Sequence, residues 1–406
     1  MATIVFDASL EVYELTKVWR YQGELEQDLK PLRHSMISLD AKFSDQKEQV
    51  GKLFQKYDIP GMNTEDIIYC CDEGQGKRAI LSWANGDAYR QSQELFLRDD
   101  ISIKHTILTG SRKILLRKEL ALILGMCTAN RITKRMFYEN GRGVSIAEGV
   151  LDEIWNAIIY TLDVDLDCEE FSLATLRKIL ISEKNVDESL TVTDESDVVI
   201  STIHKAKGKE YDTVVLNRFG KISNLDDIKV YYVAMTRSKK ELFVKTKSRL
   251  TYDIKTDSGR FIEVNSQNKL KRIELGIDGD VDYLGFVDST LHGMDYKRRQ
   301  DYIANNVKIG DPIKISKHRN EYLIIHEGHV IGRVNSKAFN SYRHYFNGGS
   351  YYLYKFDKFT DFVDLFVKDI VSVVNQRIDK SIPEPYASSG LWLGIEICGY
   401  AKPMEE

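Results

Sequence analysis

The chain has 406 residues, 43% of them hydrophobic, and a formal net charge of −4 at pH 7. That length supplies two or three globular domains, each with its own core. A membrane-spanning helix is excluded because no run of about eighteen uncharged apolar residues occurs. The acidic residues of the first segment, MATIVFDASLEVYEL, exclude a signal peptide, so we expect a cytoplasmic protein without a membrane partner.

The cysteines do not form a recognisable framework. There are five, an odd number, scattered along the chain at Cys70, Cys71, Cys127, Cys168 and Cys398. Zinc sites and disulfide scaffolds need spaced pairs, which are absent. We therefore expect reduced thiols.

Charge is distributed unevenly along the chain. Residues 201–250 hold twelve Lys or Arg and five Asp or Glu, whereas residues 183–197 hold six acidic residues and one lysine. A local basic surface attracts nucleic-acid phosphates over about 8–10 Å. The same charges also fit an ordinary solvated face, so charge alone does not decide between the two.

The first 180 residues are predicted to be mainly helical. Apolar residues at spacings of three and four predict helices over Met136–Asn156 and Phe171–Ser182. Short apolar runs at Ile67–Tyr69 and Leu122–Leu124 are candidate strands.

From Asp197 the pattern changes to short β-branched runs separated by one helix. We expect strands at Val198–Ile200, Thr213–Leu216 and Leu242–Val244, with a helix over Asp226–Lys239. Strands that alternate with a helix over a few dozen residues are typical of a βαβ unit and a largely parallel sheet. The sequence therefore predicts an α/β domain here.

After about Asn265 the sequence predicts a small β-rich domain that ends in a helix. Alternating runs bounded by glycines predict strands at Val281–Asp288, Asp311–Ser316, Tyr322–His326, His329–Val334 and Tyr351–Phe356. In the segment Asp361–Asp379, helical spacing relates Phe362, Phe366, Ile370, Val373 and Arg377. We predict a closing helix with this stripe in the core.

The most informative polar residues follow the predicted strand Val198–Ile200. The segment VVISTIHKAKGKEYDTVVL, residues 198–216, carries a histidine, three lysines, a glycine and a glutamate in its loop. Ligands of open α/β sheets bind outside the carboxyl ends of strands, so we expect a nucleotide or a DNA strand there. Gly208 permits close backbone approach, and Glu210 is an acceptor suited to a ribose hydroxyl or a metal-bound water.

A second segment, VYYVAMTRSKKELFV at residues 230–244, ends an amphipathic helix with Thr236, Arg237 and two lysines. An arginine aimed from a helix end can bind a γ-phosphate through two hydrogen bonds. Each segment alone also has an ordinary explanation. A lone histidine such as His204 is more often structural, and basic residues at a helix end complement the helix dipole.

Together the two segments resemble motifs V and VI of the UvrD/Rep/PcrA family of superfamily 1 DNA helicases. The family patterns run roughly T-x-H-x-x-K-G-x-E-[FY]-x-x-V and Y-V-[AG]-x-T-R-[AS]. The matching residues are Thr202, His204, Lys207, Gly208, Glu210, Tyr211 and Val214 for the first, and Tyr232, Val233, Ala234, Thr236, Arg237 and Ser238 for the second. Lys209 departs from the family, which usually has an apolar residue there.

The resemblance implies a second RecA-like domain and a role for each matched residue. Thr202 and His204 would contact single-stranded DNA. Gly208 and Glu210 would border the ATP, and Arg237 would be the catalytic arginine finger, in contact with the γ-phosphate.

Two upstream segments extend the resemblance in the same order. LTKVWR, residues 15–20, resembles motif IV, L-x-x-N-Y-R, with Val18 in place of Asn. It implies that Arg20 is a second phosphate-binding arginine of the ATP site. ALILGMCTANRITKRMF, residues 121–137, resembles the strand and DNA-contacting loop that follow, with Thr128 or Asn130 as contacts.

The sequence has no phosphate loop of the form G-x-x-x-x-G-K-[ST], which cradles the ATP phosphates in such motors. Its Gly-Lys pairs, at Gly51, Gly76, Gly208 and Gly220, are not followed by Ser or Thr. We expect ATP and Mg²⁺ to be shared with a first RecA-like domain, supplied by a partner protein or by a missing N-terminal region. A remnant that binds without hydrolysis is the remaining alternative.

A fainter resemblance begins after about Gly279. VKIGDPIKISKHRNEYLIIHEGHVIGRV, residues 307–334, is similar to the HIRAN domain, a small β-barrel-like module associated with DNA ends, with Leu323 where that family has an acid. YRHYFNGGSYYLYKF, residues 342–356, interleaves aromatic and basic residues, which can stack bases and neutralise phosphates. The same tyrosines can also simply fill a small barrel.

These observations predict residues 1–260 as a second RecA-like α/β domain with a helical insertion. Residues 279–406 are predicted as a β-rich, HIRAN-like, DNA-binding domain with a terminal helix. The predicted function is that of the C-terminal half of a UvrD-like ATP-dependent DNA helicase, acting in repair or phage defence. The alternative is a non-catalytic DNA-binding or assembly subunit derived from a helicase.

Overall fold

The computed structural model describes residues 24–405 apart from several short segments. The segments outside the description are 39–40, 62, 64–65, 67–75, 84, 97–104, 109–113, 193–195, 197, 219–221, 247–251, 256–260, 265–269, 277–278, 338–358 and 376–381. Two compact units are present: residues 1–83 with 201–247, and residues 84–200 with 248–406. The boundaries predicted from the sequence, 1–260 and 279–406, remain a prediction, while the contacts group residues 84–200 with the β-rich part.

The first unit is built on a parallel sheet. Its strands β1 (Arg78–Ser82), β7 (Tyr211–Arg218) and β8 (Ser238–Thr246) pair in parallel. The buried strand β6 (Val198–Thr202) ends in this unit, where Ile203 N donates to Ser82 O at 2.9 Å. The carboxyl ends of β6 and β1 therefore lie together, as the prediction of a parallel α/β sheet requires.

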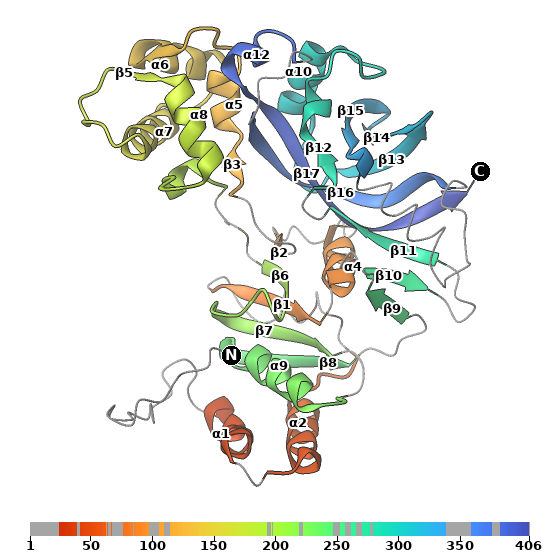
Figure 1. Cartoon of the computed structure of the whole chain (residues 1–406). Coiled ribbons are helices and arrows are strands. Elements are labelled where there is room, and N and C mark those ends of the chain that lie inside the picture. The colour runs from red at the N-terminus through yellow and green to blue at the C-terminus, as the bar shows by residue number, and fades with distance from the viewer. Residues whose placement is uncertain are drawn as a thin grey trace. The chain divides into compact units, whose positions relative to one another are not determined.

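Helices cover this sheet. The crossover α9 (Leu225–Met235) joins β7 to β8 and packs with α2 (Phe43–Tyr57), which in turn contacts α1 (Glu24–Ile37) (Figure 1). A capping box between Asn224 and Asp227 starts α9, which satisfies amide groups that the first turn leaves unpaired. The helix predicted over Asp226–Lys239 is confirmed up to Met235, but its last residues belong to β8 because Ser238 pairs with Tyr211.

A helical cluster forms one part of the second unit. It contains α5 (Glu119–Leu124), α6 (Lys134–Gly143), α7 (Glu148–Thr161) and α8 (Leu173–Ser182), with the short strands β4 (Arg131–Thr133) and β5 (Glu170–Ser172) beside them. Its core is centred on Phe137 and Trp155. The strand predicted at Leu122–Leu124 is wrong, because these residues finish α5. The single helix predicted over Met136–Asn156 is two helices, separated at Ser145, which has a positive φ of 60°.

The rest of the second unit is a large antiparallel sheet. Its order is β12-β15-β14-β13-β16-β17-β11-β10-β9, and β3 also pairs with β16. The strands are β3 (Leu116–Arg117), β9 (Tyr252–Lys255), β10 (Phe261–Val264), β11 (Leu270–Leu275), β12 (Val281–Asp282), β13 (Pro312–His318), β14 (Glu321–His326), β15 (His329–Val334), β16 (Phe359–Val374) and β17 (Leu391–Glu405). The predicted strands at Asp311–Ser316, Tyr322–His326 and His329–Val334 are confirmed, and so is a β-rich region.

Shorter elements complete the second unit. They are α4 (Asn85–Phe96), β2 (His105–Leu108), η1 (Glu188–Leu190), η2 (Tyr283–Phe286), α10 (Tyr296–Asn306) and α12 (Tyr386–Ser389). The strand predicted over Val281–Asp288 is confirmed only at its first two residues, because η2 follows. The candidate strands at Ile67–Tyr69 and Tyr351–Phe356 lie outside the described residues.

The closing helix predicted over Asp361–Asp379 is wrong, since β16 occupies most of that segment and pairs with β13 and β17. Phe362, Phe366 and Ile370 are four residues apart, a spacing that fits both a helical turn and a strand whose side chains alternate. Register shifts between Val363 and Leu365 and again between Val367 and Asp369 displace the alternation further. The apolar stripe is nevertheless core, as predicted.

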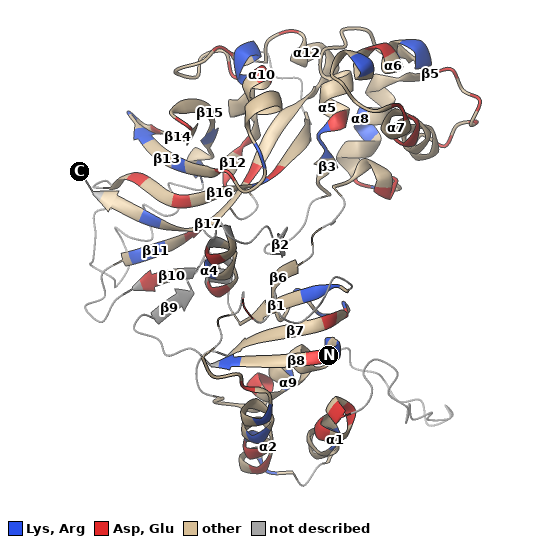
Figure 2. Cartoon of the chain, turned by 180° about the vertical axis from the view of Figure 1, so that it is seen from behind, with Lys and Arg blue, Asp and Glu red and all other residues tan. Residues whose placement is uncertain are grey.

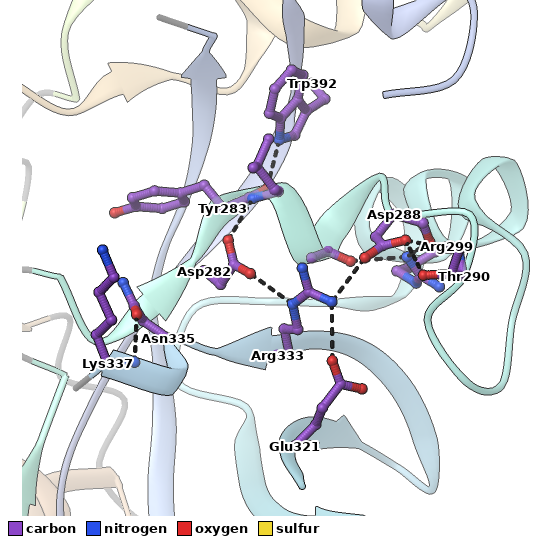
Figure 3. Close-up of polar contacts among 12 residues, drawn as sticks. Asp282, Tyr283, Asp288, Thr290, Arg299, Glu321, Arg333, Asn335, Lys337 and Trp392 are labelled. Atoms are coloured by element: carbon purple, nitrogen blue, oxygen red, sulfur yellow. Dashed lines mark hydrogen bonds and ion pairs between the residues drawn. The ribbon is translucent and has the colours of Figure 1, made fainter. Parts of the chain in front are cut away.

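Arginine side chains connect elements of the β-rich part. Arg333 of β15 forms ion pairs with Asp282, Asp288 and Glu321 at 2.6, 2.8 and 3.1 Å (Figure 3). The fully buried Arg299 of α10 donates to three backbone carbonyls, those of Gly285, Asp288 and Met294. Each guanidinium thus has acceptors that offset the cost of removing it from water.

The three cysteines that the structure describes, Cys127, Cys168 and Cys398, are free, as expected. Within the described ranges, no helix is both long and apolar enough to cross a membrane.

Candidate nucleic-acid and nucleotide site

The loop after β6 is a short crossing over the sheet. Backbone bonds from Ala206 N to Thr202 O and from Lys209 N to Ala206 O close successive turns at 3.1 and 3.0 Å. Ile203 and Ala206 are buried, while His204 and Lys205 between them are exposed. The segment begins at the carboxyl end of β6 and reaches the amino end of β7 at Tyr211.

Because the segment from Thr202 to Glu210 crosses the sheet, the site residues expected from the sequence fall into two groups at opposite edges of the sheet. Thr202 and His204 lie at the carboxyl ends of β6 and β1, as predicted. Glu210 precedes the amino end of β7, and Arg237 precedes the amino end of the neighbouring β8. The expectation that the whole loop gathers outside the carboxyl ends is therefore wrong for its second half, because eight residues suffice to cross the sheet.

At the carboxyl ends of β6 and β1, the His204 ring contacts Trp83, an aromatic residue that the sequence analysis missed. The His204 and Trp83 rings are edge to face, with centroids 6.2 Å apart and planes at 82°. Trp83 directly follows β1 and also lies 5.3 Å from the ring of Tyr231 in α9. The sequence signal for this contact was a tryptophan directly after a buried strand. Thr202 itself is 6% exposed, and its carbonyl accepts from Ala206 N, so it anchors the loop.

At the amino ends of β7 and β8, the Arg237 side chain bonds residues of both helicase-like motifs. Its Nη1 donates to Lys209 O at 3.1 Å, its Nε to Val233 O at 3.0 Å, and its Nη2 to the Thr236 hydroxyl at 3.3 Å. The Arg237 carbonyl accepts from Tyr211 N at 2.9 Å. The side chain is 5% exposed, so burial and backbone acceptors fix the guanidinium between the end of α9 and the loop.

Gly208 and Glu210 border the same end. Gly208 has a φ of +87°, which favours glycine, and no atom lies within 4 Å of the position of an added Cβ. Glu210 forms an ion pair with Lys239 at 3.3 Å, with 30% of its side chain exposed. An open backbone position beside an accessible carboxylate and an arginine fits the ribose and phosphates of a nucleotide.

The surface between the two ends is basic. Lys205, Lys207 and Lys209 are exposed along the crossing. At the start of β8, the exposed Lys239 and Lys240 form ion pairs with Glu210 and Asp212. Three exposed lysines therefore lie along the crossing itself.

The other predicted site residues lie elsewhere. Thr128 and Asn130 are exposed and belong to the second unit. Asn130 caps α8, because its Oδ1 accepts from Ala174 N at 2.8 Å and its carbonyl accepts from Leu173 N at 2.7 Å. A structural role thus accounts for Asn130 without DNA. Arg20 lies outside the described residues.

Comparison with known proteins identifies the same region. The sequence model of the UvrD-like helicase C-terminal domain matches residues 151–249. This span includes both ends of the crossing and the residues Thr202, His204, Gly208, Glu210 and Arg237, whereas Arg20, Thr128 and Asn130 fall outside it. A search of curated proteins found no match to the chain. Over residues 151–249 the chain is therefore similar to the UvrD-like helicase C-terminal domain, and its resemblance to the C-terminal half of a UvrD-like superfamily 1 helicase is confirmed.

Proposed function

We propose that this chain binds single-stranded DNA at the Thr202 end of the crossing, beside the carboxyl ends of β6 and β1, and completes an ATP site at the Glu210 end, beside the amino ends of β7 and β8. The observation that carries the proposal is the segment from Thr202 to Glu210, whose two ends present residues of different chemistry. One end offers an exposed imidazole and an indole beside lysines, which suits bases and phosphates. The other offers a glycine, a carboxylate and an arginine, which suits a nucleotide.

The phosphate loop of such a site would come from a first RecA-like domain, on a partner protein or in a missing N-terminal region. Bound ATP with Mg²⁺ would supply the energy of phosphoanhydride hydrolysis. Glu210 would accept a hydrogen bond from the ribose or from a metal-bound water, and Gly208 would let the backbone approach. Arg237 would stabilise the charge that develops on the γ-phosphate.

The bonds of Arg237 suggest how the two ends would communicate. Nη1 and Nη2 each carry a second N–H, so Arg237 could donate to a phosphate while Nη1 still holds Lys209 O. A shift of the guanidinium toward the phosphate would move Lys209 O and, with it, the turns that present the lysines and His204. A nucleotide at one end would thereby change the geometry of the DNA-binding surface at the other.

A second function is favoured by the same arginine. With 5% exposure and two backbone acceptors, Arg237 already has a structural role that needs no nucleotide. A DNA-binding or assembly subunit that no longer hydrolyses ATP would retain this arrangement.

An ATPase assay distinguishes the two functions. The purified chain alone should show no DNA-stimulated hydrolysis above background, and hydrolysis should appear when co-purifying neighbours that carry a phosphate loop are added. Sustained turnover by the chain alone, abolished by Arg237→Ala, would overturn the shared site. Binding of single-stranded DNA without hydrolysis in every combination would support the non-catalytic subunit.

A further inference from the structure

Arg177, in the helical cluster of the second unit, is partly buried. Its Nε atom is buried and has no hydrogen-bond partner, as is also true of the Nε atom of Arg299. Within the described part of the chain, its guanidinium forms no ion pair either. Burial lowers the pKa of Arg177, and no neighbouring carboxylate opposes that change.

Arg333 has the carboxylate neighbours that Arg177 lacks. Burial also acts to lower the pKa of Arg333, but its carboxylate neighbours outweigh that effect and raise the pKa overall (Figure 3). Arg299 is more deeply buried than either, and three carbonyls surround it. A partly buried guanidinium that lacks protein acceptors carries a charge that an external anion can neutralise.

The guanidinium of Arg177 is also held in place. It lies directly over Gly390, whose added Cβ would stand 2.1 Å from the Arg177 Cζ. Gly390 has a φ of +65°, and its own N–H and carbonyl bond to Tyr386 O and Asn375 N. The glycine therefore provides a flat support and takes none of the five donors of the arginine. A planar donor group fixed in this way favours the paired oxygens of a phosphate.

The surroundings of Arg177 point to nucleic acid as the source of that phosphate. Arg177 is one helical turn from Leu173, whose N–H is bonded by Asn130 at the start of α8. An added Cβ on Gly125 would lie 3.1 Å from the carbonyl of Leu391, which follows the Gly390 beneath Arg177. The segment from Gly125 to Asn130, in which Met126 and residues 128–130 are exposed, and the Arg177 guanidinium thus contact adjacent residues. Lys178 is exposed on the same helix, and Figure 2 shows the basic stretch of α8.

We propose that Arg177 binds a backbone phosphate of single-stranded DNA on the α8 surface of the second unit. This contact is separate from the crossing between β6 and β7 in the first unit. It goes beyond the proposed function, which assigns no phosphate contact to the second unit, and it does not require ATP.

The first test measures thermal stability of the full chain with inorganic phosphate as the probe. Arg177→Gln should raise the melting temperature in chloride buffer, because the substitution removes an uncompensated charge. Phosphate at equal ionic strength should stabilise the wild type, and Arg177→Gln should lose that stabilisation. Arg135→Gln, an 87% exposed position paired with Glu139 in the same helical cluster, is the matched control and should behave as the wild type.

The second test measures single-stranded DNA affinity over a salt series by fluorescence anisotropy. Arg177→Gln should reduce the slope of log affinity against log salt by about 0.7, which corresponds to a roughly threefold change in the affinity ratio between 50 and 200 mM salt. Stabilisation by phosphate with an unchanged DNA slope would assign the site to a small anion and overturn the proposal. A lowered melting temperature in chloride, without any phosphate effect, would show a purely structural arginine and would also overturn it.

The two proposals fail in different ways. If the crossing does not bind DNA, lysine substitutions there leave the salt slope unchanged while the Arg177 effect persists. If only the crossing binds DNA, the reverse pattern appears.

Discussion

The crossing in the first unit and the β-rich part of the second unit use arginine in opposite ways. Arg333 and Arg299 are surrounded by carboxylates and carbonyls, and their donors connect β12, η2 and β15. Arg237 is also buried, yet its acceptors are carbonyls of a loop whose other residues are exposed lysines and a histidine. Arginines that bond carboxylates and carbonyls of a folded region are typical of structure, whereas a buried arginine that bonds an exposed loop can exchange its partners.

The largest expected effect separates these two uses. In the assembled ATPase, Arg237→Ala should reduce turnover by about 10³–10⁵, as removal of an arginine finger does. Because Lys209 O also loses its donor, DNA affinity should fall modestly rather than stay unchanged. Lys240→Ala, at an exposed residue paired with Asp212 close by, should leave turnover near normal. Steady-state ATPase rates and anisotropy measure both quantities, and a variant that loses only DNA binding would contradict the arginine-finger assignment.

A smaller effect is expected in the β-rich part. Arg299→Met should lower the free energy of unfolding by about 3 kcal/mol or more, since three carbonyls lose a donor at about 1–3 kcal/mol each. Arg298→Met, at the neighbouring 83% exposed position of α10, should stay within about 0.5 kcal/mol. Chemical denaturation measures both. Equal stabilities of the two variants would show that Arg299 does not organise this region.

DNA binding by the crossing should be sensitive to charge. Replacement of Lys205, Lys207 and Lys209 by Gln should reduce the salt slope for single-stranded DNA by about 2, at roughly 0.7 per phosphate contact. Lys52→Gln, a 71% exposed residue of α2 in the same unit, is the control and should leave the slope unchanged. A slope that the triple variant does not alter would mean that the lysines form an ordinary solvated face.

The smallest expected effect is on the stability of the fold at acid pH. Burial raises the pKa of Asp288, but hydrogen bonds from Thr290 and the charge of Arg333 outweigh it and lower the pKa overall. The ionised form is therefore favoured in the folded state. Its stabilisation is present above the unfolded pKa of about 3.9 and is lost as pH falls through the lower folded value. Asp288→Asn should flatten the dependence of stability on pH below about pH 4, and an unchanged acid transition would show that other carboxylates dominate.

To test DNA binding by the second unit, single substitutions are more informative than truncation. Removal of residues 279–406 would take away β17, which pairs with β11 through Ile273 and Ala401. The edge of β11 would then lose its backbone partners. Loss of DNA binding in such a truncated chain would not distinguish a missing contact from a broken sheet.

The sequence by itself determined the parallel sheet and the resemblance to UvrD-like helicases. Its β-branched runs and the spacing of polar residues in two short segments predict β6, β7, α9 and β8. Those signals are local, since periodicity and turn chemistry act over a few residues. The same patterns correctly predicted β13, β14 and β15.

The tertiary structure decided where these residues meet. A four-residue apolar spacing fits helix and strand equally, and only pairing with β13 and β17 makes Phe359–Val374 a strand. The partners of Arg237, the contact between Trp83 and His204, and the uncompensated Arg177 over Gly390 all join residues distant in sequence. Such contacts depend on burial and on which acceptors the fold brings near, neither of which a local pattern specifies.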